Sequence, residues 1–365
     1  MKLNELHGGE VEWAVSERYN IPISEIISFA STVSPIIPTS IVSLARKFDK
    51  LYLYPARDHT KLKEIIARHQ ELNAGRMILG CGSTEIIHLI AQLIAPAEAI
   101  IPVPSYGEYE AAVLKHGGKP VFVGPADNFG LDVEAIGGAI SARTKAIFIC
   151  NPNNPTGKLY DKRDLEELAK IAEERDLVLV VDEAYLAFAP DSKKYSMTSF
   201  IRSYPILVLN SLSKLFGVPS LRLGWGMGSS TLVNQLENLK IPWTISNLAV
   251  WAAEELLSDS SHQKQVRSLI SSQRSELKTQ FDEIKWLKAY PSDCNFFLLQ
   301  ILDNRITATD VFEGLVKKGI VVRDCSSMRT LGNRFFRITI RTPGDNKKLI
   351  SSLTEKFAPT PTLHY

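Results

Sequence analysis

Three separated segments of this 365-residue chain carry side chains that could do chemistry together. They are residues 151–157 (NPNNPTG), residues 181–185 (VDEAY) and residues 211–217 (SLSKLFG), and Arg222 follows the last of them. Each segment alone is weak evidence, because surface lysines and turn asparagines are common. Together they supply an amine from Lys214, an acid and a cradle for a phosphate.

The amine of Lys214 can form a Schiff base with an aldehyde cofactor, and the carboxylate of Asp182 can pair with a pyridine nitrogen. A carboxylate beside that nitrogen keeps it protonated, which makes the ring a better electron sink. Asn154 and Tyr185 could hydrogen-bond the ring hydroxyl, and Tyr106 could stack on the ring. We therefore expect pyridoxal 5'-phosphate as the cofactor, Lys214 and Asp182 as catalytic residues, and no metal.

A cofactor phosphate needs backbone N–H groups and positive charge. Residues 80–85 (GCGSTE) lie between a short apolar run and a predicted helix. Glycines let the backbone approach a phosphate, and the start of a helix offers free N–H groups with a favourable dipole. The candidate phosphate ligands come from this loop and from the lysine segment: Gly82, Ser83, Thr84, Ser211, Ser213 and Arg222.

Composition narrows the class of protein. Hydrophobic residues make up 45% and charged residues 22%, and the net charge is +2, so neither nucleic acid nor an anionic membrane is indicated as a partner. The four cysteines lack zinc or redox spacing. The first residues lack the apolar core of a secretion signal. The apolar region 86–103 is interrupted by charges and prolines, which predicts a buried helix and a strand, not a membrane span. We expect a cytoplasmic protein.

The apolar pattern predicts an α/β fold. Seven short runs are candidate strands: residues 77–79, 99–103, 120–123, 146–150, 177–181, 206–209 and 221–227. One intervening helix is marked by apolar residues at helical spacing: Leu165, Leu168, Ala169 and Ala172. Runs that are apolar on both faces and separated by helices predict a mostly parallel seven-stranded sheet, covered on both sides. Ligands of such sheets lie beyond the carboxyl ends of the strands, where Asn154, Asp182 and Lys214 fall.

The length predicts two domains. The expected parts are an irregular N-terminal arm joining the small domain (1–45), a large cofactor domain (46–245), a smaller α+β C-terminal domain (246–357) and a tail (358–365). The arm is expected to be irregular because Pro22, Pro35 and Pro38 discourage long helices. In the smaller domain, a helical region from 248 to about 281 precedes apolar runs that predict a second sheet: 296–299, 320–322 and 335–340.

These segments resemble the fold-type I aminotransferase superfamily of pyridoxal-phosphate-dependent enzymes, and the resemblance extends over nearly the whole chain. It implies that Lys214 holds the cofactor and that Asp182, Asn154, Tyr185 and Arg222 have the roles given above. It also implies a homodimer with active sites at the subunit interface. In that family a tyrosine before a proline, matched here by Tyr54, reaches the cofactor phosphate of the partner subunit.

Within the superfamily, the chain is similar to the histidinol-phosphate aminotransferase branch and, in that branch, most similar to the threonine-phosphate decarboxylases of cobalamin synthesis. The matching motifs are 7–9 (HGG), 27–29, 34–35, 241–247, 322–326 and 336–341. The resemblance implies that five residues contact a small phosphorylated amino acid: His7, Gly8, Asn154, Arg323 and Arg337. Arg337 can take the α-carboxylate bidentately, while Arg323 and His7 meet the phosphate.

One substrate position departs from the family pattern. The family has an Asn-x-Asn-Pro run whose first Asn contacts the substrate, and Thr32 holds that place here, in residues 31–35 (STVSP). A hydroxyl can still donate to a phosphate but lacks the second group of the amide. The implied reaction is decarboxylation of O-phospho-L-threonine to (R)-1-aminopropan-2-yl phosphate and CO2. O-phospho-L-serine is an alternative substrate, because one methyl group discriminates only on the order of 10–200-fold.

Other functions remain open. A histidinol-phosphate or other amino acid aminotransferase would use the same groups but would hold the Cα–H bond perpendicular to the ring, so the motifs do not separate the two reactions. The ligand-sensing domain of a transcription regulator would carry an added DNA-binding segment, and the sequence shows no basic helix-turn-helix. A structural homologue without activity is disfavoured by the presence of Lys214, Asp182, Asn154 and Arg222.

Overall fold

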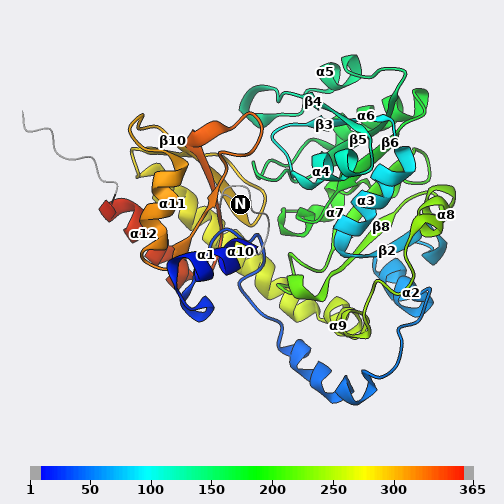
Figure 1. Ribbon diagram of the computed structural model, residues 1–365, viewed down its shortest axis with the longest axis horizontal. Coiled ribbons are helices and arrows are strands. Elements are labelled where there is room, and N and C mark those ends of the chain that lie inside the picture. The colour runs from blue at the N-terminus through cyan, green and yellow to red at the C-terminus, as the bar shows by residue number, and fades with distance from the viewer. Residues whose placement is uncertain (1–9, 357–365) are drawn as a thin grey trace, which may run out of the picture.

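The computed structural model describes residues 10–356. The chain forms two sheet-containing parts, one built around a large sheet and one around a smaller sheet near the C-terminus (Figure 1). The long helix α10 (Ser260–Asp282) follows the large part in sequence and packs on both the smaller sheet and the 3-10 turn Leu186–Phe188 of the large part. The helix α10 therefore connects the two parts.

The large sheet confirms the predicted seven strands. They are β2 (Met77–Cys81), β3 (Glu98–Pro102), β4 (Lys119–Val123), β5 (Thr144–Cys150), β6 (Val178–Asp182), β7 (Ile206–Ser211) and β8 (Leu223–Met227), in the spatial order β2-β8-β7-β6-β5-β3-β4. Within this sheet β8 is antiparallel to both neighbours and the other pairings are parallel. The sheet is thus mostly parallel, as predicted.

Helices cover the large sheet. They are α2 (Thr60–His69), α3 (Gly82–Ile94), α4 (Glu108–Lys115), α5 (Val133–Gly138), α6 (Lys162–Glu174), α7 (Ser192–Tyr195) and α8 (Ser230–Leu239). The predicted apolar stripe of α6 is buried, and the helix begins where Asp161 accepts the Arg163 N–H at 2.9 Å. Consecutive residues 146–150 of β5 are all buried, so both faces of the sheet are covered.

The smaller part also forms a sheet. Its strands are β9 (Leu287–Ala289), β10 (Phe296–Ile301), β12 (Arg323–Asp324) and β13 (Phe335–Thr339), antiparallel in the order β12-β13-β10-β9. Its helices are α10, α11 (Ala308–Val316) and α12 (Pro343–Lys356), whereas α9 (Asn247–Ser258) packs on α2 and on the 3-10 helix Thr39–Lys50. The helical region predicted from 248 to 281 is two helices. Asp259 separates them, because its side chain accepts the His262 N–H and caps α10.

One predicted strand of the second sheet pairs elsewhere. Within the predicted run 320–322, β11 (Ile320–Val321) lies parallel to β1 (Ile27–Ser28), a strand from the N-terminal segment. The next two residues, which form β12, join the four-stranded sheet instead. The predicted place of residues 320–322 in the second sheet was wrong for residues 320–321, because apolar periodicity identifies a strand but does not determine its partner.

The N-terminal segment is more regular than predicted. It contains α1 (Glu10–Tyr19) and a 3-10 helix, Thr39–Lys50, which lies beside α9 at the lower edge of the molecule in Figure 1. The expectation of an irregular arm was wrong because all three prolines fall after α1. Val11 and Val15, one helical turn apart, are buried, and the prolines limit the helices instead of preventing them.

Between residues 10 and 356, none of the helices is long and apolar enough to cross a membrane.

Candidate active site

A cavity of about 710 Å³ lies at the carboxyl ends of β5, β6 and β7. This volume is in the range of small-molecule and cofactor sites. Eleven of the predicted cofactor residues line it: Gly82, Ser83, Thr84, Tyr106, Asn154, Asp182, Tyr185, Ser211, Ser213, Lys214 and Arg222. Of the predicted substrate residues, Thr32, Arg323 and Arg337 line it together with Asn154.

One predicted site residue lies elsewhere, and two are not described by the structure. Tyr54 does not line the cavity; its side chain is 86% exposed and contacts the Trp243 ring at 6.2 Å between ring centres. His7 and Gly8 fall outside the described residues. Within the described residues, the other residues of the prediction line the cavity together with further residues described below.

Lys214 follows β7 and points its amine into the cavity. The Nζ atom donates a hydrogen bond to Thr32 Oγ1 at 3.2 Å and lies 5.4 Å from the centre of the Tyr185 ring. Burial, with a smaller contribution from the Arg337 charge, lowers the pKa of Lys214 to about 8. A much larger share of the amine is therefore neutral at physiological pH than for an ordinary lysine, and the neutral form is the one that attacks an aldehyde.

Asp182 is the last residue of β6 and is buried. Its Oδ1 atom accepts the Ala184 N–H at 3.0 Å, and its Oδ2 atom accepts the Tyr109 hydroxyl at 3.0 Å. Burial raises the pKa of Asp182. A protonated pyridine nitrogen beside the carboxylate would supply the positive charge that such a buried acid lacks.

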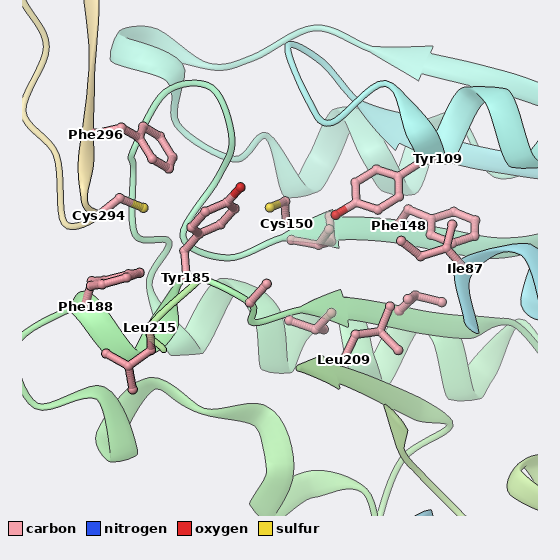
Figure 2. Close-up of a cluster of buried hydrophobic side chains, with 14 of the residues drawn as sticks. Ile87, Tyr109, Phe148, Cys150, Tyr185, Phe188, Leu209, Leu215, Cys294 and Phe296 are labelled. Carbon is pink, nitrogen blue, oxygen red and sulfur yellow. The ribbon is translucent and has the colours of Figure 1, made fainter. Parts of the chain in front are cut away.

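Tyr109 is a site residue that the sequence analysis did not identify. It is fully buried, its ring stacks on Phe148 at 5.4 Å, and its hydroxyl points toward the end of β5, where Cys150 lies (Figure 2). Burial raises the pKa of the Tyr109 hydroxyl well above its usual value, so the hydroxyl remains a donor. The signal was present in the spacing from Tyr106, because Tyr109 follows it by three residues, in the first turn of α4, and the two rings meet edge to face at 5.5 Å between ring centres.

The start of α3 forms a cradle that fits a phosphate. The first N–H groups of a helix have no partner within it, and the side chain of Cys81, which precedes α3, makes no capping bond. Gly82 has a φ of +73° and packs against the Arg222 guanidinium, so a side chain at this position would clash. Gly224 likewise lies against the backbone of Ser83. Two glycines and one arginine therefore leave room for an anion at a helix N-terminus.

Tyr185 and Asn154, the groups expected near the ring hydroxyl, each have a hydrogen-bond partner in the site. Tyr185 shares a hydrogen bond with Thr32 at 2.7 Å between the two hydroxyl oxygens, and Asn154 accepts a hydrogen bond from Arg337 Nη1. The Tyr185 ring meets the edge of Phe296 at 5.1 Å between ring centres (Figure 2). Burial raises the pKa of Tyr106 to about 12, so its hydroxyl is neutral beside the cavity.

Two arginines lie side by side at the cavity wall. Arg323 of β12 and Arg337 of β13 are directly opposite each other in the antiparallel pair, and both are buried. Arg337 Nη2 donates to the Ala30 carbonyl at 2.7 Å, and within residues 10–356 its guanidinium forms no ion pair. Like charges directly opposite in a sheet are destabilising, so a bound anion would stabilise this arrangement.

Other lining residues were missed by the sequence analysis. Trp13 and Met328 line the cavity, and Glu108 does so while it contacts His88 at 2.9 Å. Trp13 lies on α1, which was predicted as irregular, and no motif marks the other two. Cys150 lines the cavity with its thiol bonded to the Pro152 carbonyl, and burial raises the pKa of this thiol.

The donor set fits pyridoxal 5'-phosphate better than a metal. Between residues 10 and 356 no group of His, Cys, Asp and Glu side chains could hold a metal ion. The cavity instead brings together an amine of lowered pKa on Lys214, an acid on Asp182 and an anion cradle at Gly82. The amine matches the aldehyde of that cofactor, the acid matches its pyridine nitrogen, and the cradle matches its phosphate.

Comparison with known proteins gives concordant results. The aminotransferase class I and II family matches residues 30–353. A "Putative threonine-phosphate decarboxylase" of Caldanaerobacter subterraneus subsp. tengcongensis is 34% identical over 326 residues, covering 88% of each chain. A histidinol-phosphate aminotransferase of Methanosarcina mazei is 31% identical over 342 residues, covering 92% of this chain and 89% of the relative.

A solved structure shares the fold. The histidinol-phosphate aminotransferase from Sinorhizobium meliloti in complex with pyridoxal-5'-phosphate has a TM-score of 0.86 and 22% identity. The match covers 96% of this chain and 94% of that one. The compared proteins thus agree in fold and differ in the reaction for which they are named.

Proposed function

The chain belongs to the aminotransferase class I and II family of pyridoxal-phosphate-dependent enzymes, with a fold-type I architecture, and on that premise we propose that it decarboxylates O-phospho-L-threonine. The products are (R)-1-aminopropan-2-yl phosphate and CO2. The observation that most supports this proposal is the buried pair Arg323 and Arg337, which offers two adjacent positions for anionic groups. Arg222 and the start of α3 remain for the cofactor phosphate.

In this proposal the residues of the site have separate roles. Pyridoxal phosphate, when bound, supplies a conjugated ring that takes up the electron pair of a bond broken at the substrate Cα. Asp182 would stabilise a positive charge on the ring nitrogen, and Lys214 would hold the cofactor through its amine. Arg337 binds the α-carboxylate as a fork, while Arg323 binds the phosphate. His7 and Gly8 remain proposed phosphate contacts.

Orientation decides which bond breaks. The arginine pair would fix the carboxylate and the phosphate of one substrate at two points, so that the Cα–carboxylate bond stands perpendicular to the ring. Once CO2 has left, a proton must reach Cα, and Lys214 is suitably placed to deliver it because its amine lies in the cavity with a pKa near 8.

The test is CO2 release from O-phospho-L-threonine by the cofactor-loaded protein, without any keto acid. We expect many turnovers, and a parallel assay with O-phospho-L-serine measures what Thr32 and the cavity do to specificity. A preference for phosphoserine would make the protein a phosphoserine decarboxylase that yields ethanolamine phosphate. Absence of CO2 from both substrates would contradict the proposal.

The second candidate function is a histidinol-phosphate or related amino acid aminotransferase. Relatives 31% and 32% identical carry that name, and a lysine with a lowered pKa suits removal of the Cα proton. Histidinol phosphate carries a phosphate but no carboxylate, so one arginine of the pair would serve only the keto-acid acceptor. Formation of glutamate from histidinol phosphate and 2-oxoglutarate would establish this function.

We also propose that the protein is a homodimer. Large apolar side chains are exposed over one connected region, the apolar patch: Ile37, Val42, Phe48, Leu51, Tyr52, Leu53, Tyr54, Ile241 and Trp243. The two chain segments meet where Tyr54 contacts Trp243 and where Asn247 Nδ2 donates to the Leu53 carbonyl. Exposed apolar patches of this kind mark protein interfaces. A second copy would cover the patch and bring Tyr54 to the partner cavity.

A further inference from the structure

The hydroxyl of Thr32 connects two groups of the candidate site. It accepts a hydrogen bond from Lys214 Nζ at 3.2 Å and lies 2.7 Å from the Tyr185 hydroxyl. A threonine hydroxyl has one proton and two lone pairs, so it can serve both neighbours at once. Thr32 is only 4% exposed, so water does not compete for these bonds.

The backbone on both sides of Thr32 is anchored. The Ser34 N–H donates to the Lys214 carbonyl at 2.9 Å, and the Ala30 carbonyl accepts from Arg337 Nη2 at 2.7 Å. The Phe29 N–H, three residues before Thr32, also donates to the Val321 carbonyl at 2.7 Å. The position of the Thr32 hydroxyl is therefore fixed from the large part and from the smaller part of the molecule.

We propose that Thr32 is a positioning residue for Lys214, and that its hydroxyl, oriented by Tyr185, holds the amine whenever Lys214 is not joined to the cofactor. The inference rests on the proposed role of Lys214 as the cofactor lysine but not on the choice between decarboxylation and transamination. It gives Thr32 a role beyond the substrate contact implied by resemblance. In the described part of the chain, Thr32 is the hydrogen-bond partner of Nζ.

Several charged or ionisable groups also act on Lys214 from the surrounding elements. Arg337 of β13 and Arg222 before β8 lower the pKa of Lys214, whereas Asp182 of β6 and Cys150 of β5 raise it. These four groups act through space. The Thr32 hydroxyl acts by direct contact, and a hydrogen bond from an ammonium is stronger than one from a neutral amine. Thr32 therefore favours the protonated form of Lys214.

The test measures the protonation of Lys214 directly. The full-length chain, freed of cofactor and shown to regain it, is labelled with trace acetic anhydride over a range of pH. Mass spectrometry of the Lys214 peptide gives the midpoint of its reactivity. We expect a midpoint near 8 for the unmodified protein. For Thr32→Val, which keeps the shape but lacks the hydroxyl, we expect a midpoint lower by about one unit.

Two further variants make the test specific. Thr32→Ser retains the hydroxyl and should restore the original midpoint. Thr144→Val removes another buried threonine hydroxyl, which accepts the Ser141 N–H at 3.0 Å at the far end of β5, and should change nothing. If Thr32→Val does not fold, Thr32→Ala serves in its place, because it also lacks the hydroxyl.

Two results would overturn the inference: an unchanged midpoint in Thr32→Val, or an equal shift in Thr32→Val and Thr32→Ser. The second result would show that the shift does not depend on the hydroxyl, because Thr32→Ser retains it. Failure of the proposed function has a different signature, because neither phosphoamino acid would then release CO2, whatever the midpoint of Lys214. Retained absorbance of the bound cofactor in Lys214→Ala would instead overturn the role of Lys214 on which the inference rests.

Discussion

Asp182 is held by two donors from within the protein, the Ala184 N–H and the Tyr109 hydroxyl. Each occupies a different carboxylate oxygen, so the plane of the carboxylate is set before any cofactor binds. The remaining lone pairs are free to face the cavity that Asp182 lines. A preset acceptor of this kind lowers the entropy that the cofactor ring must lose on binding.

Removing Tyr109's hydroxyl tests this account. Tyr109→Phe deletes one bond to a carboxylate, which is worth about 1.5–3 kcal/mol. We expect the affinity for pyridoxal phosphate to fall about tenfold or more, measured by equilibrium titration of cofactor absorbance. Tyr160→Phe, in a buried tyrosine whose hydroxyl, among the described residues, makes no hydrogen bond to Asp182, is the matched control. Equal affinities for both variants would remove Tyr109 from the site.

Lys214→Ala should abolish the absorbance of the covalently held cofactor, because no other lysine lines the cavity between residues 10 and 356. Activity should fall on the order of 10³-fold, since the variant also lacks the group that moves the proton. Spectra of the purified variant after addition of pyridoxal phosphate provide the check. An unchanged spectrum would show that Lys214 is not the cofactor lysine.

At the scale of elements, two buried acids at the end of β6 have different roles. Glu183 follows Asp182 and is buried, and its carboxylate accepts the Met197 N–H at 2.7 Å and the Ser196 hydroxyl at 2.8 Å. It therefore ties the 3-10 helix Met197–Phe200 to the end of the strand. Burial raises the pKa of Glu183 to about 7, against 4.5 for an ordinary glutamate.

This raised pKa predicts a pH dependence of stability. Between pH 4.5 and about 7 the folded chain keeps a proton that the unfolded chain has lost, so this group's contribution is complete below pH 4.5 and lost as the pH rises to 7. The loss is about 3 kcal/mol at most. Glu183→Gln should remove this slope, as judged by urea unfolding of both proteins at pH 5 and pH 7.5. Parallel slopes would contradict the assignment.

The predictable part of the site lies on the parallel strands. Asn154, Asp182 and Lys214 each follow an apolar run, and the common direction of parallel strands brings such positions to one edge, so the seven strands and the grouping could be foreseen. The partners of the N-terminal segment could not be foreseen from the sequence. Nothing local in residues 27–28 specifies pairing with β11, and nothing local joins Thr32 to Lys214.

At the scale of the whole molecule, the apolar patch predicts the oligomeric state. Val42 is 74% exposed within it, so Val42→Lys would place an unpaired charge in the proposed interface. We expect dimer dissociation to become at least about 100-fold easier, measured by light scattering across a dilution series. Leu114→Lys is the control, because Leu114 is an exposed leucine on α4 outside the patch. Light scattering that shows the unsubstituted protein to be a monomer would contradict the proposed homodimer.

The pairing of β1 with β11 also bears on how the enzyme matures. During synthesis, residues 27–36 leave the ribosome long before Ile320 exists, so the strand that guides Thr32 to Lys214 must wait for nearly the whole chain. Contacts of such long sequence separation form late, because loop closure must precede them. The lysine pocket is therefore finished last. A ligand that binds only the finished pocket, as we expect of pyridoxal phosphate, stabilises completed molecules over unfinished ones.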